Sequence, residues 1–189
     1  EMLRSLVGSE MCIRDSYKPV GVTCTERDPH AEKKIMDMIR YPERLTYAGR
    51  LDKDSEGLIL LTNDGDLINA MMRGANRHEK EYIVKTDREI TPDFLEKMAK
   101  GIYLKDLDIT TRECEIEQIG KFTFRIVLTQ GVNRQIRRMC EACGYRVKAL
   151  KRIRIMNILL GDLKPGKWRE VTGEELEQLQ RDTGMLNRN

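Results

Sequence analysis

The stretch Gly49–Gly57 reads GRLDKDSEG and leads directly into the aliphatic run Leu58–Leu61, LILL. A short aliphatic run bounded by turn residues predicts a buried strand. A glycine at each end of the charged stretch permits a tight bend or the close approach of a ligand. Charged side chains held at the end of a core strand contribute little to packing. We therefore place a candidate site at Asp52 and interpret the rest of the chain around it.

Two other interpretations fit the same stretch. Asp52, Asp54 and Glu56 occupy the first, third and fifth positions of a calcium-binding loop. The twelfth position is Asn63 instead of a bidentate glutamate, and the loop enters a strand instead of a helix, so we predict no metal site here. The remaining alternative is an exposed charged turn before a strand, which the spacing alone does not separate from a functional site.

The composition indicates a soluble protein that does not associate with a membrane. A chain of 189 residues can bury one good core, and no apolar run is long enough for a transmembrane helix. The net charge is only +3, but eight basic residues and one acidic residue lie between Asn133 and Arg154. A basic block in an otherwise acidic domain is typical of nucleic-acid binding, although a solvated face is the alternative.

The cysteines indicate a reducing compartment. Five cysteines are an odd number without the spacing of a disulfide framework, so we expect a cytoplasmic protein. Cys140 and Cys143 form a single CxxC motif, and a zinc site would need a second pair of ligands. Ile136, Met139, Cys140 and Cys143 instead follow the spacing of one apolar helix face.

Helices and strands alternate with hairpins, without regular βαβ repeats. This order predicts an α+β fold with a largely antiparallel mixed sheet flanked by helices. We expect strands at 45–48, 58–62, 79–86 and 168–171, an extended basic segment at 146–156, and a hairpin of 110–119 with 121–128. We expect three helices whose caps are Asp28-Pro29, Asp64 or Asp66, and Thr91-Pro92. We also expect a basic helix at 132–143 and a last helix whose capping box is Thr172 with Glu175.

The domain boundaries follow from a change in sequence character. Residues 1–16 show no periodicity and no capping pattern, and their stretch RSLVGSEMCIRDS resembles translated adapter sequence. We expect 1–16 to be a non-native segment, 17–182 to form one catalytic domain, and 183–189 to be a tail.

Three segments carry a family resemblance when they are taken in order. They are GRLDKDSEGLILLTNDGD at 49–66, KEYIV at 80–84, and GVNRQIRRMCEACGYRV at 131–147, which LKRIRI follows. YKPVG at 17–21 and GDLKPGKWREVTGEEL at 161–176 fit the same family. Together they resemble the pseudouridine synthases, specifically the RsuA/RluB/RluE/RluF group that modifies ribosomal RNA, and above all its RluF or RluB branch. The resemblance spans 17–179.

The resemblance implies an isomerase with three catalytic residues. Asp52 is implied as the nucleophilic carboxylate, Arg137 as its ion-pair partner, and Tyr82 as the side chain that stacks on the flipped uracil and helps to remove its C5 proton. Outside the family, Arg137 would be a phosphate contact and Tyr82 a half-buried strand residue. Pseudouridine formation gains and loses no atom, so no cofactor is expected.

The resemblance also implies RNA contacts. Arg50 is the candidate for filling the stack that the flipped base vacates, and other basic residues hold phosphates. The predicted RNA-binding residues are Arg50, Lys53, Arg73, Arg77, Lys80, Arg134, Arg138, Lys151 and Arg152.

The expected partner is ribosomal RNA, with 23S RNA favoured and 16S RNA or transfer RNA as alternatives. We expect a monomer that acts without the N-terminal S4-type RNA-binding domain that this group normally carries, so RNA binding should be weaker. The competing hypothesis is a non-catalytic RNA-binding factor for ribosome assembly on the same scaffold, which would not need Asp52, Tyr82 and Arg137 together.

Overall fold

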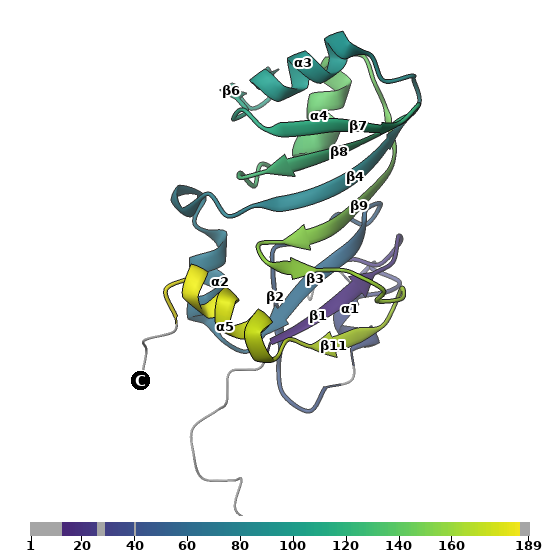
Figure 1. The fold of residues 1–189 in the computed structure, drawn as a ribbon. Helices are drawn as coiled ribbons and strands as arrows, with labels where there is room; N and C mark the ends of the chain where they lie inside the picture. Colours follow the sequence, from purple (N-terminus) through teal and green to yellow (C-terminus); the bar gives the residue numbers. More distant parts are fainter. Residues whose placement is uncertain (1–12, 26–28, 40, 186–189) are drawn as a thin grey trace, which may run out of the picture.

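A computed structural model describes residues 13–25, 29–39 and 41–185 (Figure 1). The strands are β1 (Ile13–Lys18), β2 (Thr46–Ala48), β3 (Glu56–Thr62), β4 (Lys80–Thr86), β5 (Tyr103–Leu104), β6 (Ile109–Thr110), β7 (Glu115–Gly120), β8 (Thr123–Leu128), β9 (Val147–Ile155), β10 (Ile158–Leu159) and β11 (Trp168–Glu170). The helices are α1 (Ile35–Met38), α2 (Gly65–Met72), the 3₁₀ turn η1 (Gly74–Asn76), α3 (Pro92–Lys100), α4 (Gln135–Ala142) and α5 (Gly173–Asp182).

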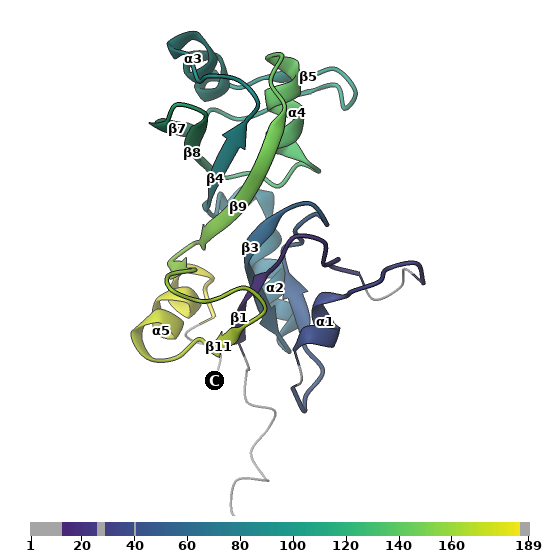
Figure 2. The ribbon, with the colours of Figure 1, turned by 90° about the vertical axis from the view of Figure 1, so that its right-hand side faces the viewer.

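One sheet of nine strands runs through the molecule in the order β11-β1-β3-β9-β4-β8-β7, with β2 added on β3 and β10 on β9. Within the described ranges β3 and β9 form a parallel pair, and the other strand pairs of this sheet are antiparallel. The predicted α+β fold with a largely antiparallel mixed sheet is therefore confirmed. Figures 1 and 2 show two halves stacked along this sheet, which meet where β9 passes between β3 and β4.

The aliphatic run in β3 is buried on both faces, as predicted. Leu58 and Leu60 pack into a cluster that includes residues of α2 and α5, whereas Ile59 and Leu61 pack against Ile35 and other residues of α1 and the loops around it. All four side chains are at most 1% exposed. Full burial of one such side chain stabilises the fold by about 1.5–3 kcal/mol. A strand buried on both faces reads as a continuous apolar run because neither face needs polar residues.

The other half of the sheet packs against α3 and α4. Phe94 and Met98 of α3 and Met139 and Cys140 of α4 form one cluster with β4, β8 and β9. The predicted apolar helix face is therefore confirmed, and Cys140 is part of it. Burial raises the pKa of the Cys140 thiol to about 12, so the thiol stays protonated and packs as a small apolar group.

The junction between the two halves depends on Gly57. The parallel pairing of β3 with β9 matches Gly57 with Arg152. Gly57 has a φ of +112°, and a Cβ atom on it would lie 2.2 Å from the carbonyl oxygen of Arg152. Only glycine allows this approach, which brings β9 against the start of β3 directly after the Asp52 loop.

Local signals located several helices correctly. Asp64 caps α2, because its Oδ1 accepts hydrogen bonds from the backbone N–H groups of Asp66 at 2.9 Å and Leu67 at 3.2 Å. Thr91 caps α3 by accepting from the N–H of Phe94 at 3.1 Å. Both caps agree with the predictions, and Asp64 caps α2 instead of Asp66.

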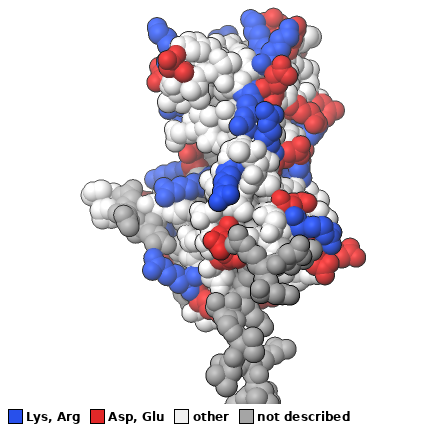
Figure 3. Space-filling model, turned by 90° about the vertical axis from the view of Figure 1, so that its left-hand side faces the viewer, with Lys and Arg blue, Asp and Glu red and all other residues white. Residues whose placement is uncertain are grey.

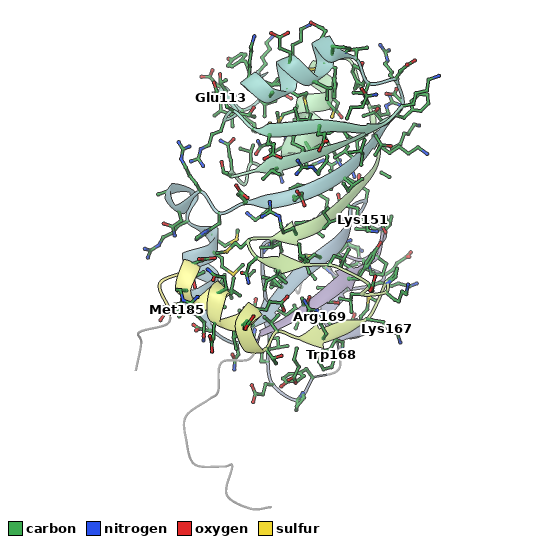
Figure 4. All side chains as sticks on the ribbon, viewed as in Figure 1. Glu113, Lys151, Lys167, Trp168, Arg169 and Met185 are labelled. Carbon is green, nitrogen blue, oxygen red and sulfur yellow. The ribbon has the colours of Figure 1, made fainter. Side chains whose placement is uncertain are left out.

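Other expectations were wrong. The helix expected after Asp28-Pro29 begins only at Ile35, and Asp28 lies outside the described residues. The capping box is not formed, because Thr172 makes no side-chain cap and Glu175 instead accepts a hydrogen bond from Arg169 at 3.0 Å. Figure 4 labels Arg169. A carboxylate gains more from a charged guanidinium than from a backbone N–H. The expected strand at 110–119 is split, with 109–110 paired to 103–104 and β7 beginning at Glu115.

The sheet begins four residues before the predicted domain boundary at 17. Ile13–Ser16 belong to β1 and pair with β3 and β11. Strand pairing uses backbone groups, so a segment without apolar periodicity can still add to a sheet. Asp15 is buried in this strand beside Arg169 at 2.9 Å, and desolvation raises the pKa of its carboxyl to about 6 despite that cation. Residues 1–12 of the segment lie outside the described residues.

None of the helices within 13–25, 29–39 and 41–185 is long and apolar enough to span a bilayer.

Candidate active site

Asp52 lies in the loop between β2 and β3, at the junction of the two halves of the sheet. The loop turns tightly, with the N–H of Ser55 donating to the carbonyl of Asp52 at 3.1 Å. Apolar residues anchor both ends, since Leu51 is buried in the core and β3 follows immediately. The Asp52 side chain is 35% exposed. The core therefore holds the backbone in place while the carboxylate faces solvent at the edge of a cavity.

Arg134 is the ion-pair partner of Asp52 among the residues that the structure describes. Its Nη1 lies 3.4 Å from Oδ2 of Asp52. The resemblance implied Arg137 in this place, and the structure differs. Arg134 directly precedes α4 and has a left-handed backbone conformation with φ of 51°. This conformation brings its side chain toward the loop one helical turn before Arg137.

Arg137 binds the same loop farther along the chain. It donates from Nη2 to the carbonyl of Asp54 at 3.1 Å and to Oγ of Ser55 at 3.2 Å, and its Nη1 lies 3.5 Å from Oδ2 of Asp54. Its side chain is only 12% exposed. Arg137 thus anchors the loop that carries Asp52 through Asp54 and Ser55 and makes no ion pair with Asp52 among the described residues.

Asp54 lies between the two arginines. Arg134 donates from Nη1 and Nη2 to its two carboxylate oxygens at 3.2 Å and 3.3 Å. Partial burial pushes the pKa of Asp54 upward, but the hydrogen bond from Arg134 and the charge of Arg137 outweigh it, and the pKa lies below its ordinary value. The site therefore holds two carboxylates and two guanidinium groups within one cluster.

Tyr82 lies on β4 and lines the same cavity as Asp52. Its ring is half-buried and packs against hydrophobic clusters on both sides. Within the described part of the chain, its hydroxyl has no hydrogen-bond partner. An aromatic face and an unengaged hydroxyl in a cavity with a carboxylate are suited to holding a planar base.

The cavity has a volume of about 1340 Å³ and is open to solvent. Its walls come from the Asp52 loop, the start of α4, β4 and β9. Typical small-molecule pockets measure about 300–1,000 Å³, so this cavity can accept more than a single nucleobase. Lys80 lies in its wall, and burial together with the charge of Arg152 lowers the pKa of Lys80 to about 8.

Five of the predicted RNA-binding residues line the cavity, namely Arg50, Lys53, Lys80, Arg134 and the buried Arg152. The Arg50 guanidinium lies over the ring of Tyr47, 5.5 Å from its centroid. Arg73 and Arg77 are exposed on either side of η1, in the segment that joins the cavity residues Met72 and Lys80. Figure 3 shows several Lys and Arg side chains across the middle of one face, with basic and acidic side chains intermixed above and below them.

Three of the predicted RNA-binding residues have other roles. Lys151 points away from the cavity and lies 5.3 Å from the ring centroid of Tyr17, because its neighbours on β9 face the cavity (Figure 4). Arg152 is 2% exposed and donates to the carbonyls of Leu58 at 2.8 Å and Gly49 at 3.1 Å. Arg138 donates to the carbonyl of Asn133 at 2.9 Å, outside the cavity lining.

Some residues that support the site were not predicted. Lys18 is fully buried and donates to the carbonyls of Pro19 at 2.8 Å and Val22 at 2.7 Å, next to the Asp52 loop. Gln135 donates to Gln130 at 3.2 Å and fixes the approach to α4. The position of Lys18 directly before the Pro19–Gly21 turn could have indicated that it stabilises a loop, whereas no local sequence pattern predicts the role of Gln135.

The three acidic residues of the loop pair with cationic or hydroxyl groups of the protein and do not form a metal-ligand cluster among the described residues. Asp52 and Asp54 pair with Arg134, and Glu56 accepts a hydrogen bond from the hydroxyl of Tyr17 at 2.8 Å. In the described ranges no group of three or more metal-ligating side chains is present. These carboxylates serve as partners for cationic and hydroxyl groups of the protein.

The chain is similar in sequence to RNA pseudouridine synthases. The family model described as RNA pseudouridylate synthase matches residues 16–142. The chain is 48% identical over 162 residues to the dual-specificity RNA pseudouridine synthase RluF of Escherichia coli K12, covering 86% of this chain and 55% of that protein. It is 33% identical over 172 residues to the ribosomal large subunit pseudouridine synthase B of Vibrio cholerae, covering 86% of this chain and 52% of that protein. The chain thus spans about half the length of these curated relatives.

A solved structure shows the same fold. A crystal structure of pseudouridylate synthase matches with a TM-score of 0.84 and 29% identity, over 90% of this chain and 74% of that chain. The family match includes the Asp52 loop, Tyr82 and the start of α4, which are the elements that build the cavity. By sequence and by fold, the chain belongs to the RNA pseudouridine synthase family, within its RsuA/RluB/RluE/RluF group.

Proposed function

We propose that this chain isomerises a uridine of ribosomal RNA to pseudouridine with Asp52 as the nucleophile. The observation that carries the proposal is the presence of Asp52, Tyr82 and two guanidinium groups in one open cavity. The reaction breaks the bond between N1 of uracil and C1′ of the ribose and joins C5 to C1′. The C5 proton is lost and N1 regains one, so the atoms balance without an added group.

Four residues of the cavity have a part in this reaction. Asp52 adds to the nucleotide as a carboxylate, and Arg134 orients it by an ionic contact. Tyr82 stacks on the uracil and lies where it can help to remove the C5 proton. A uridine in folded RNA must first flip out, at a cost of a few kcal/mol. Arg50 fills the vacated stack by leaving the ring of Tyr47.

We propose large-subunit ribosomal RNA as the substrate. One relative carries the large ribosomal subunit in its name, and the basic residues around the cavity suit a polyanion. Small-subunit RNA and transfer RNA are the competing substrates, and the name of another relative states dual specificity. We expect a monomer in the cytoplasm, and Cys24, Cys114, Cys140 and Cys143 are free thiols in agreement with a reducing compartment.

The test measures tritium release from RNA labelled at C5 of uracil. The parent chain, Asp52→Asn and the control Asp162→Asn are incubated with deproteinised large-subunit RNA, small-subunit RNA and transfer RNA. Asp162 is exposed in a turn and does not line the cavity, so its substitution removes a carboxylate without touching the site.

We expect release with the parent and the Asp162 variant, and none with Asp52→Asn. Equal release by Asp52→Asn would rule out Asp52 as the nucleophile. Absence of release from every RNA, with RNA still bound, would support the non-catalytic RNA-binding factor instead. The RNA that releases tritium identifies the substrate class.

A further inference from the structure

Asp54 has no part in the proposed reaction, yet it makes more contacts with the two arginines than Asp52 does. Both of its carboxylate oxygens accept from Arg134, at 3.2 Å and 3.3 Å, and Oδ2 lies 3.5 Å from Nη1 of Arg137. With the described residues, Asp52 makes one ionic contact, at 3.4 Å from Arg134. Among the described residues, Asp54 is the carboxylate that contacts both guanidinium groups.

Arg134 needs such a partner because little else holds it. Its side chain is 40% exposed, and it precedes α4 without capping the helix. RNA brings phosphates to this edge of the cavity, and phosphates bind guanidinium groups as two-pronged acceptors. A single contact with Asp52 competes poorly against them. A bidentate contact with Asp54 fixes the plane of the guanidinium and keeps Nη1 between the two carboxylates.

We propose that Asp54 is a positioning residue that holds the guanidinium groups of Arg134 and Arg137 beside Asp52 while RNA occupies the cavity. The inference rests on the proposed function of Asp52. Asp54 acts through the arginines and does not touch the substrate. Its backbone carbonyl serves the same purpose, because Arg137 binds it at 3.1 Å and thereby fixes the loop.

The charges predict that Asp54→Asn lowers the reaction rate without weakening RNA binding. Two carboxylates face two guanidinium groups in the free protein. In Asp54→Asn, one carboxylate remains for the two cations, and Arg134 becomes free to bind an RNA phosphate. RNA affinity is then unchanged or increased, whereas the orientation of Asp52 and the rate decrease. A residue needed only for folding would lower stability and affinity together.

The experiment compares the parent, Asp54→Asn and the control Asp162→Asn. The single-turnover rate at saturating RNA, the RNA dissociation constant and the melting temperature are measured for each. We expect the rate of Asp54→Asn to fall about 10- to 100-fold, as for misplaced catalytic groups, while its dissociation constant does not rise. An unchanged rate overturns the inference, and so does a rate loss explained by weaker binding or by unfolding.

A double-mutant cycle tests whether Asp54 acts through Arg134. Arg134→Gln alone slows the reaction, and adding Asp54→Asn then costs much less than it costs in the parent, because the interaction is already gone. If the rate loss of the double variant equals the product of the two single-variant losses, Asp54 does not act through Arg134 and the proposal is overturned.

A measurement without RNA separates this inference from the proposed function. Arginine side-chain NMR reports how fast the Arg134 guanidinium rotates, and a bidentate contact slows that rotation. We expect faster rotation in Asp54→Asn than in the parent and in Asp162→Asn. Equal rotation in all three overturns the inference even if the chain is active. An inactive parent with slowed Arg134 rotation contradicts the proposed function alone and supports the Asp54 contact.

Discussion

The lysine in the cavity wall differs from the other cations because its charge depends on pH in the ordinary working range. Burial and the charge of Arg152 lower the pKa of Lys80 to about 8 in the free protein. An RNA phosphate binds the protonated form, so RNA affinity is greatest below pH 8. Above pH 8 it falls by up to about tenfold per pH unit, because binding must then take up a proton.

Lys80→Arg provides the matched control for this prediction. Arginine keeps its charge throughout this range, so the dissociation constant of the variant should stay constant between pH 7 and pH 9. Binding is measured by fluorescence anisotropy at fixed ionic strength. If the parent and Lys80→Arg lose affinity equally as the pH rises, the loss comes from another group, and Lys80 is not a phosphate contact.

The meeting of β3 and β9 is the element on which the geometry of the site depends. A methyl group on Gly57 would lie 2.2 Å from the carbonyl oxygen of Arg152, and its φ of +112° disfavours any side chain. We expect Gly57→Ala to lower the free energy of unfolding by about 3 kcal/mol, because rigid backbone must move. The strands would separate where the Asp52 loop begins, so the remaining folded protein should also react more slowly.

Gly65→Ala is the control for that prediction. Gly65 begins α2, a methyl group on it would meet no atom within 4 Å, and alanine favours a helix. Urea denaturation should show little loss of stability, or a small gain, for Gly65→Ala. Similar losses in the two variants would show that the close approach at Gly57 does not determine stability.

Across the whole molecule, the basic residues divide between two sides of the sheet. Arg73 and Arg77 are exposed in the segment joining two cavity residues, whereas Lys151 lies on the opposite side over Tyr17. We expect the double variant Arg73→Gln/Arg77→Gln to bind RNA more weakly and to lower the salt dependence of binding. Each lost phosphate contact should reduce the slope of log K against log salt by about 0.7 for single-stranded RNA.

Lys151→Gln removes a positive charge from the other side and should change neither affinity nor slope. The rate at saturating RNA should stay the same in both variants, since neither touches Asp52. Filter binding over a range of salt concentrations measures the slopes. An equal decrease in slope for Lys151→Gln would show that the RNA also contacts the far side of the sheet.

Local signals determined much of this protein. The run Leu58–Leu61 predicted a buried strand, because exposing four consecutive aliphatic side chains to water costs free energy. The caps at Asp64 and Thr91 were predictable because a capping side chain binds N–H groups two or three residues away. The family segments located Asp52 and Tyr82, and the fold brings both into one cavity.

Tertiary structure alone decided which cation meets which carboxylate. Arg134 and Arg137 lie one helical turn apart, and each side chain is long enough to reach the Asp52 loop, so spacing could not assign them. Because of the left-handed backbone at Arg134 and the position of the loop, Asp52 pairs with Arg134, and Asp54 pairs with both Arg134 and Arg137. Strand register decided that Arg152 is buried beneath the loop while its neighbour Lys151 faces away. Local sequence specifies elements because its interactions are short-ranged, whereas these pairings depend on where distant elements pack.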